Sequence, residues 1–142
     1  MAITLNGTQG ITGMPMIMEN ATVSAIAATG TINYDTLTQT VLYYTTNASG
    51  NWTLNIRGNN TTTLNTVLGT GQSLSVVFMV TQGSTAYYNN VVQIDGVTVT
   101  PEWLNGAAPT YGNASGIDVY NYSILKTAPS TYVVFATQSK YA

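Results

Sequence analysis

The chain has 142 residues, of which three are basic and five acidic, and it contains neither His nor Cys. A soluble domain of this length ordinarily carries roughly 35 charged residues. This composition excludes histidine- and cysteine-dependent catalysis, disulfides and cysteine-ligated metals, and it leaves almost no positive charge to neutralise the phosphates of a nucleic acid. The length fits one domain, and so few surface charges favour association into a homo-oligomer.

Residues 1–18 lack the pattern of a strand, because three glycines and a proline interrupt every run. They also lack the basic region and continuous apolar run of a signal peptide, and no stretch of the chain is long and apolar enough to predict a membrane span. We interpret residues 1–18 as an arm that docks on a neighbouring subunit, ahead of a domain of residues 19–142. The alternative is a first strand and turn of that same domain. The apolar side chains with which the arm would dock are Met14, Met16, Ile17 and Met18.

The rest of the chain has an all-β composition, rich in Thr, Val and Tyr. Turn-forming residues recur about every ten positions, which is typical of a sandwich or barrel. Trp52, Leu54 and Ile56 alternate with polar neighbours and predict a strand that covers a core on one side. Residues 62–68 are expected to form at most one helical turn.

The segment 73–81 is apolar in both alternating positions, which predicts a central strand or one at a subunit contact. Its Leu74, Val76, Phe78 and Val80 share one face, and Val77 and Met79 share the other. Further along, Asp95-Gly96 between two β-rich runs predicts a two-residue type I′ hairpin.

Two further strands, residues 117–127 and 131–139, are expected to form a closing hairpin around Pro129. The predicted fold is therefore all-β: a two-sheet antiparallel sandwich, jelly-roll-like, with an N-terminal arm. We expect the subunit interface to combine the arm with four side chains of the sandwich. These are Val77, Met79, Tyr120 and Tyr122.

The remaining options for catalysis are a carboxylate pair for glycoside cleavage or a Ser-Lys arrangement. The acidic candidates have simpler structural explanations: Asp95 supplies hairpin geometry, and Asp118 alternates out of the face formed by Ile117 and Val119. The chain has neither a glycine motif for phosphates nor an EF-hand, although a structural calcium in an Asn- or Asp-rich loop is an alternative. We predict a protein that is not an enzyme and needs no cofactor or metal.

Aromatic residues are abundant, and such side chains populate cores, protein interfaces and sugar-binding platforms. Trp52 is expected in the core, whereas Trp103 is expected to cap the sandwich or insert into a neighbour. Tyr87 and Tyr88 lie between turn signals and are the candidates for an exposed pair. If the protein contacts a glycan, the candidate residues are Tyr87, Tyr88, Trp103 and Tyr111.

Three long segments carry a resemblance to a known group. They are YYTTNASGNWTLNIRGNNTTTLN from Tyr43, GQSLSVVFMVTQGSTAYYNNVVQIDG from Gly71 and TPEWLNGAAPTYGNASGIDVYNYSILKT from Thr100. Over roughly residues 30–142 the chain resembles β-rich virion structural proteins of marine tailed phages, both particle-surface and tail-fibre-like. The resemblance implies a virion component and brings no catalytic motif.

The resulting expectation is a non-enzymatic bacteriophage virion structural protein, assembled in the host cytoplasm. It would be a small homotrimer on the particle exterior, of the head decoration, cement or head-fibre type. Its partners would be other copies and other virion proteins, not nucleic acid or membrane. The alternative is a tail-fibre tip or receptor-binding adhesion module that contacts host surface glycan, and a third class, a polysaccharide-degrading enzyme, requires a carboxylate pair.

Overall fold

The computed structural model describes residues 4–6, 10–12 and 18–142. Strands β1 (Thr4–Asn6) and β2 (Gly10–Thr12) pair antiparallel in a two-stranded sheet of their own. Of the predicted docking side chains, Met14, Met16 and Ile17 lie outside the described residues, and the side chain of Met18 is 81% exposed. Docking by residues 1–18 therefore stays a prediction.

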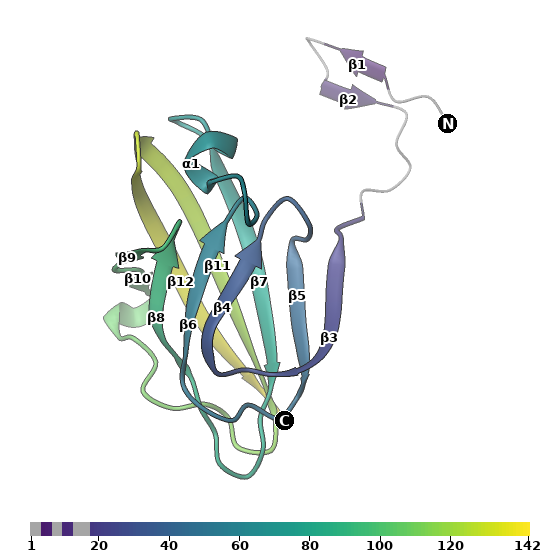
Figure 1. The fold of residues 1–142 in the computed structure, drawn as a ribbon, viewed down its shortest axis with the longest axis vertical. Coiled ribbons are helices and arrows are strands. Elements are labelled where there is room, and N and C mark those ends of the chain that lie inside the picture. Colours follow the sequence, from purple (N-terminus) through teal and green to yellow (C-terminus); the bar gives the residue numbers. More distant parts are fainter. Residues whose placement is uncertain (1–3, 7–9, 13–17) are drawn as a thin grey trace.

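Residues from Ala21 onward form two β-sheets that face each other across a common core, which confirms the predicted sandwich (Figure 1). The six-stranded sheet has the order β10 (Glu102–Trp103), β12 (Thr131–Tyr141), β11 (Ile117–Ala128), β7 (Ser73–Thr81), β5 (Val41–Thr46) and β3 (Ala21–Ala27). The four-stranded sheet has the order β4 (Gly30–Asp35), β6 (Trp52–Arg57), β8 (Asn89–Ile94) and β9 (Val97–Val99). Two short helices, α1 (Leu64–Val67) and the 3₁₀ turn η1 (Leu104–Gly106), complete the described elements.

The strand directions differ from the expectation. From β3 to β8 the chain changes sheet after every strand, so β3, β5 and β7 lie side by side and parallel, as do β4, β6 and β8. Antiparallel pairing joins β7 to β11, β11 to β12, and β8 to β9. Both sheets are therefore mixed, not antiparallel throughout as predicted, and the jelly roll is not confirmed. The physical reason is that a turn between sheets and a hairpin within one sheet use the same turn-forming residues.

The core is built around Trp52, as the alternation in its strand predicted. Its ring meets Phe78 and Tyr120 edge-on, with ring centroids 5.8 and 5.7 Å apart. Leu54 and Ile56 are fully buried beside it. The prediction of a central strand at 73–81 is confirmed, because β7 lies between β5 and β11 and buries Val76, Phe78 and Val80.

The predicted hairpin at Asp95-Gly96 and the predicted helical turn within residues 62–68 are both confirmed, and hydrogen bonds join the two. Asp95 and Gly96 have φ angles of 52° and 80°, the left-handed values that a type I′ turn requires. The Asp95 carboxylate also accepts hydrogen bonds from the backbone N–H groups of Leu64 and Asn65, at 2.7 and 3.0 Å. Lys126 donates from Nζ to the backbone oxygens of Asn65 and Leu68, at 2.6 and 2.8 Å. The short helix is therefore held at both ends by charged side chains.

The orientation of β11 overturns two sequence interpretations. Tyr120 and Tyr122 are completely buried in the core, so the prediction that they form a subunit interface is wrong. Asp118 lies on the same inward face and is equally buried, while Ile117 and Val119 point outward. The Oδ2 atom of Asp118 and the hydroxyl of Tyr122 have hydrogen-bond partners within the core, which offsets part of the cost of burying these two side chains.

Candidate functional site

The outer side of the six-stranded sheet carries apolar side chains from five neighbouring strands. The strand register brings Val23, Tyr43, Met79 and Val119 into one row across β3, β5, β7 and β11. Phe135, on β12, is 56% exposed although it is a large aromatic side chain. We call this surface the outer apolar face. Its apolar side chains are Val23, Val41, Tyr43, Val77, Met79, Ile117, Val119, Leu125, Val133 and Phe135.

Formal charge is absent from the outward positions of β3, β5, β7, β11 and β12. The charged residues Asp118 and Lys126 of β11 both point inward. Glu102 lies at the border of the face, on the two-residue edge strand β10 in register with Phe135. The face is therefore neutral across five strands, with an acidic residue at its rim.

Two pairs of polar side chains within the outer apolar face are hydrogen-bonded to each other along the sheet. Tyr43 Oη and Thr81 Oγ1 share a hydrogen bond of 3.2 Å between β5 and β7. Ser75 Oγ and Ser123 Oγ share another of 3.2 Å between β7 and β11. These hydroxyls already have partners, so covering the face with another surface would leave fewer polar groups unsatisfied.

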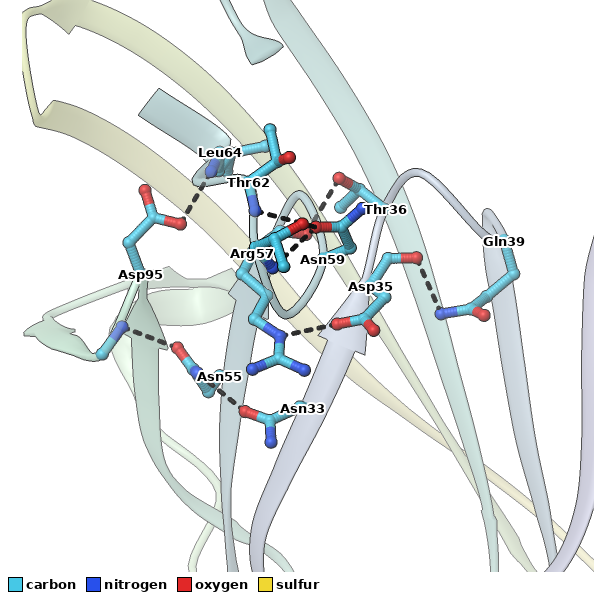
Figure 2. A network of polar contacts seen from close by, with 12 residues as sticks. Asn33, Asp35, Thr36, Gln39, Asn55, Arg57, Asn59, Thr62, Leu64 and Asp95 are labelled. Carbon is cyan, nitrogen blue, oxygen red and sulfur yellow. Dashed lines mark hydrogen bonds and ion pairs between the residues drawn. The ribbon is translucent and has the colours of Figure 1, made fainter. Parts of the chain in front are cut away.

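The outer side of the four-stranded sheet has the opposite character, as Figure 2 shows. Asn55 donates from Nδ2 to Asn33 Oδ1 at 2.8 Å and accepts from the Gly96 backbone N–H at 2.8 Å. One step along the same two strands, Arg57 Nε donates to Asp35 Oδ1 at 2.7 Å. Side chains from β4 and β6 thus form a polar ladder that extends to the turn after β8.

A cleft of about 400 Å³ lies where β8 and β9 approach the segment of β10. Tyr88 and Trp103, two of the four predicted glycan-contact residues, are among its lining residues. The Trp103 ring also contacts the core, edge-on to Tyr122 with 6.2 Å between ring centroids. Trp103 therefore caps the edge of the sandwich, one of the two roles expected for it. The remaining lining is mixed: Asn89, Asn90, Val91, Val92, Thr98, Val99, Thr100, Pro101, Ala108 and Pro109.

The other two glycan candidates lie outside this cleft. Tyr87 is half-buried, and its backbone N–H and carbonyl are both hydrogen-bonded to the Gln82 side chain. Tyr111 is 66% exposed, and Lys140 Nζ lies 3.3 Å from the centre of its ring. The structure therefore brings Tyr88 and Trp103 to one site and does not assemble all four residues into a single platform.

A buried polar cluster fastens the segment that carries Tyr88. Asp118 Oδ2 accepts hydrogen bonds from Gln82 Nε2 at 2.9 Å and from the Asn113 backbone N–H at 3.0 Å. Burial raises the pKa of the Asp118 carboxyl, while the hydrogen bonds from Asn113 and Gln82 and the charge of Lys140 act in the other direction. Because Gln82 also holds Tyr87, the cluster ties the loop between β7 and β8 to β11.

The acidic side chains mostly have structural tasks. Asp35 pairs with Arg57, Asp95 caps α1, and Asp118 holds the loop before β8. Among the described residues, no three potential metal-binding side chains of the types His, Cys, Asp and Glu lie together. Over that same part of the chain, none of the helices has the length and apolar character needed to cross a bilayer.

No protein-family model, no curated protein and no solved structure matches this chain.

Part of this surface is predictable from the sequence. Val77 and Met79 do lie at the centre of the outer apolar face, as their strand's two-sided pattern suggested. The polar ladder was missed, although Asn33 and Asp35 repeat the spacing of Asn55 and Arg57. Polar residues at the same alternating positions of two strands are the pattern by which the ladder could have been found.

Proposed function

We propose that the protein is a non-enzymatic structural component of a bacteriophage virion, located on the particle exterior as a head decoration, cement or head-fibre protein. The observation that carries this proposal is the outer apolar face, which spans five strands, has no charge at its outward positions and contains two hydrogen-bonded pairs of hydroxyl side chains. Monomeric proteins rarely expose such patches, and large ones mark sites of protein association. The resemblance to phage virion proteins indicates the virion as the assembly in which this association would take place.

The positions of the acidic groups support a role without catalysis. A glycosidase needs one carboxyl group to act as an acid and a second as nucleophile or base across the scissile bond. Asp35, Asp95 and Asp118 are each engaged in contacts that hold the fold together. Three of the five acidic side chains thus have structural roles.

Within the virion, the protein would contact other copies of itself and neighbouring coat or appendage subunits. Residues 1–18 are the proposed docking segment, and Met18, at its described end, exposes 81% of its side chain. A flexible apolar side chain of this kind adapts to the surface of a partner. The arm and the outer apolar face would therefore serve two different contacts.

The test is the protein's presence and abundance in purified particles. Quantitative mass spectrometry of virions should find the protein at a copy number comparable to that of a coat component. A variant lacking residues 2–18 should remain folded by circular dichroism and fail to bind particles from which the native protein has been removed. Absence of the protein from virions contradicts the proposal, and binding by the deletion variant contradicts the arm as docking segment.

A second function, adhesion to host glycan, is favoured by one observation: the cleft that contains Tyr88 and Trp103. Aromatic rings beside hydroxyl and amide groups suit the apolar faces and polar edges of sugars. Adhesion predicts few copies per particle and binding of the isolated protein to host cells. Tyr88→Ala should reduce that binding, whereas the control Tyr111→Ala, at an exposed ring outside the cleft, should not.

A further inference from the structure

We propose that the outer apolar face is the contact with a second copy of this chain, and that two copies pack these faces together about a twofold axis as a homodimer. This deepens the proposed function by naming the first partner in assembly, and it rests on that function only for its biological role. The contact itself is a property of the isolated protein. Its elements are the outward sides of β3, β5, β7, β11 and β12.

The size of the face is appropriate for a stable dimer. Five strands of 6 to 12 residues, at about 3.3 Å per residue and about 4.8 Å between strands, present about 700 Å². An interface of standard size takes about 800 Å² from each partner. One outer apolar face against another therefore approaches the area of a specific interface without help from any other surface.

The chemistry of the face favours a second copy over a different partner. Specific contacts between unlike proteins are commonly steered by complementary charge, and the outward positions of the five strands offer none. A neutral face meets its own copy without bringing like charges together. Glu102, beside Phe135, lies at the border of the face, where interfaces ordinarily keep their charged groups in contact with water.

The geometry favours a pair over a larger ring. Two sheets pack face to face about 10 Å apart, with side chains of the two surfaces interdigitating. When the same surface is used by both partners, the contact closes on itself about a twofold axis and each copy has one face to offer. The contact therefore yields a dimer in place of the homotrimer expected from the sequence. The polar ladder of the four-stranded sheet remains outside, facing water.

The test measures the mass of the full-length protein in solution by sedimentation equilibrium and by light scattering at micromolar concentration. The native chain should be a dimer. Met79→Lys keeps a side chain of similar length while placing a charge at the centre of the face, and it should raise the dimer dissociation constant by more than about tenfold. The matched control is Gln93→Lys, which adds the same charge to the outer side of β8 and should leave the dimer intact.

A native chain that is monomeric or trimeric overturns the proposal, as does a Met79→Lys protein that is folded and still dimerises like the native chain. If Met79→Lys does not fold, Phe135→Lys takes its place, because that side chain is 56% exposed and contributes little to the core. The two proposals fail separately: a dimer that is absent from virions contradicts only the virion role, and an abundant virion component that is monomeric in solution contradicts only the dimer.

Discussion

The two sheets of this protein share one core yet have outer faces of opposite chemistry. On the four-stranded sheet, Asn33, Asn55, Asp35 and Arg57 join neighbouring strands by side-chain hydrogen bonds and an ion pair (Figure 2). On the six-stranded sheet, the corresponding positions of five strands are apolar or carry hydroxyl and amide groups. The difference shows that the low charge of the chain is unevenly distributed. One face is lined with hydrogen-bonded polar side chains, and the other is the uncharged surface for which we propose contact with a second copy.

The largest effect on stability is expected at Asp95, which follows β8 of the four-stranded sheet and holds the N-terminus of α1. Asp95→Ala removes the acceptor for the N–H groups of Leu64 and Asn65 and should lower the free energy of unfolding by about 2 kcal/mol. Urea unfolding followed by tryptophan fluorescence measures this change. The control Asp95→Asn keeps an acceptor oxygen and the turn preference, and should lose less. Equal losses for the two variants would contradict the capping role.

The polar ladder itself is tested by Asn55→Ala. This change leaves Asn33 Oδ1 and the Gly96 N–H without their partner and should cost about 1 kcal/mol, because water can reach part of the site. Gln93→Ala, at the neighbouring position in register on the same face, serves as the control in the same unfolding experiment. Equal stability of the Asn55→Ala and native proteins would show that the ladder does not stabilise the fold.

On the outer apolar face, removing a pair of side chains that are hydrogen-bonded to each other should leave the free energy of unfolding nearly unchanged. Replacing both Ser75 and Ser123 by Ala removes the two hydroxyls that bond to each other, and should change the free energy of unfolding by less than about 0.5 kcal/mol. The same double variant makes the face more apolar, so its dimer should be at least as tight as that of the native chain. Weaker dimerisation, measured by sedimentation, would contradict the proposed chemistry of the contact.

The smallest effect on the free energy of unfolding is expected at Asp118, in the core between the two sheets. Burial holds its pKa above the ordinary value of 3.8, with the hydrogen bonds from Asn113 and Gln82 and the charge of Lys140 offsetting part of the effect. Because the folded state binds this proton more tightly than the unfolded state, ionisation of Asp118 lowers stability as the pH rises from the unfolded pKa through the folded one. Below the pKa of the unfolded state, the stability that the protonated Asp118 carboxyl contributes is fully present.

Asp118→Asn should therefore flatten the dependence of unfolding free energy on pH as the pH rises from the ordinary Asp pKa of 3.8 toward neutrality. The measurement is a series of urea unfolding curves for the native and variant proteins across that range. The difference between the two proteins should grow toward neutral pH, in favour of the variant. A variant that loses stability relative to the native protein as the pH rises would contradict this assignment.

Much of the local structure was predictable from the sequence. Period-two alternation placed Trp52, Leu54 and Ile56 on one buried face, and the two-sided apolar pattern identified β7 as central. The chemistry of Asp95-Gly96 fixed the hairpin, because few residue pairs adopt positive φ at both positions. These predictions succeeded because the information lies within a few residues of the chain.

The candidate surfaces were predictable only in part. The pattern of β7 indicated that Val77 and Met79 share a second apolar face, and Tyr88 and Trp103 were both candidates for ligand contact. Whether Tyr88 and Trp103 line the same cleft depends on how β8 lies relative to β10, and these two strands belong to different sheets. Residues distant along the chain meet through sheet order, and sheet order is not a local property.

By itself, the sequence determined that this chain forms strands, which residues along each strand share a face, and that few charges would be available outside. The tertiary structure alone decided which face of β11 turns inward, burying Tyr120 and Asp118 and exposing Val119. It also decided that alternate strands pair in parallel. The physical reason is that alternation defines two faces of a strand but does not say which of them is buried. That choice depends on the neighbouring strands and on partners such as Gln82 and Asn89, which form hydrogen bonds with buried polar groups.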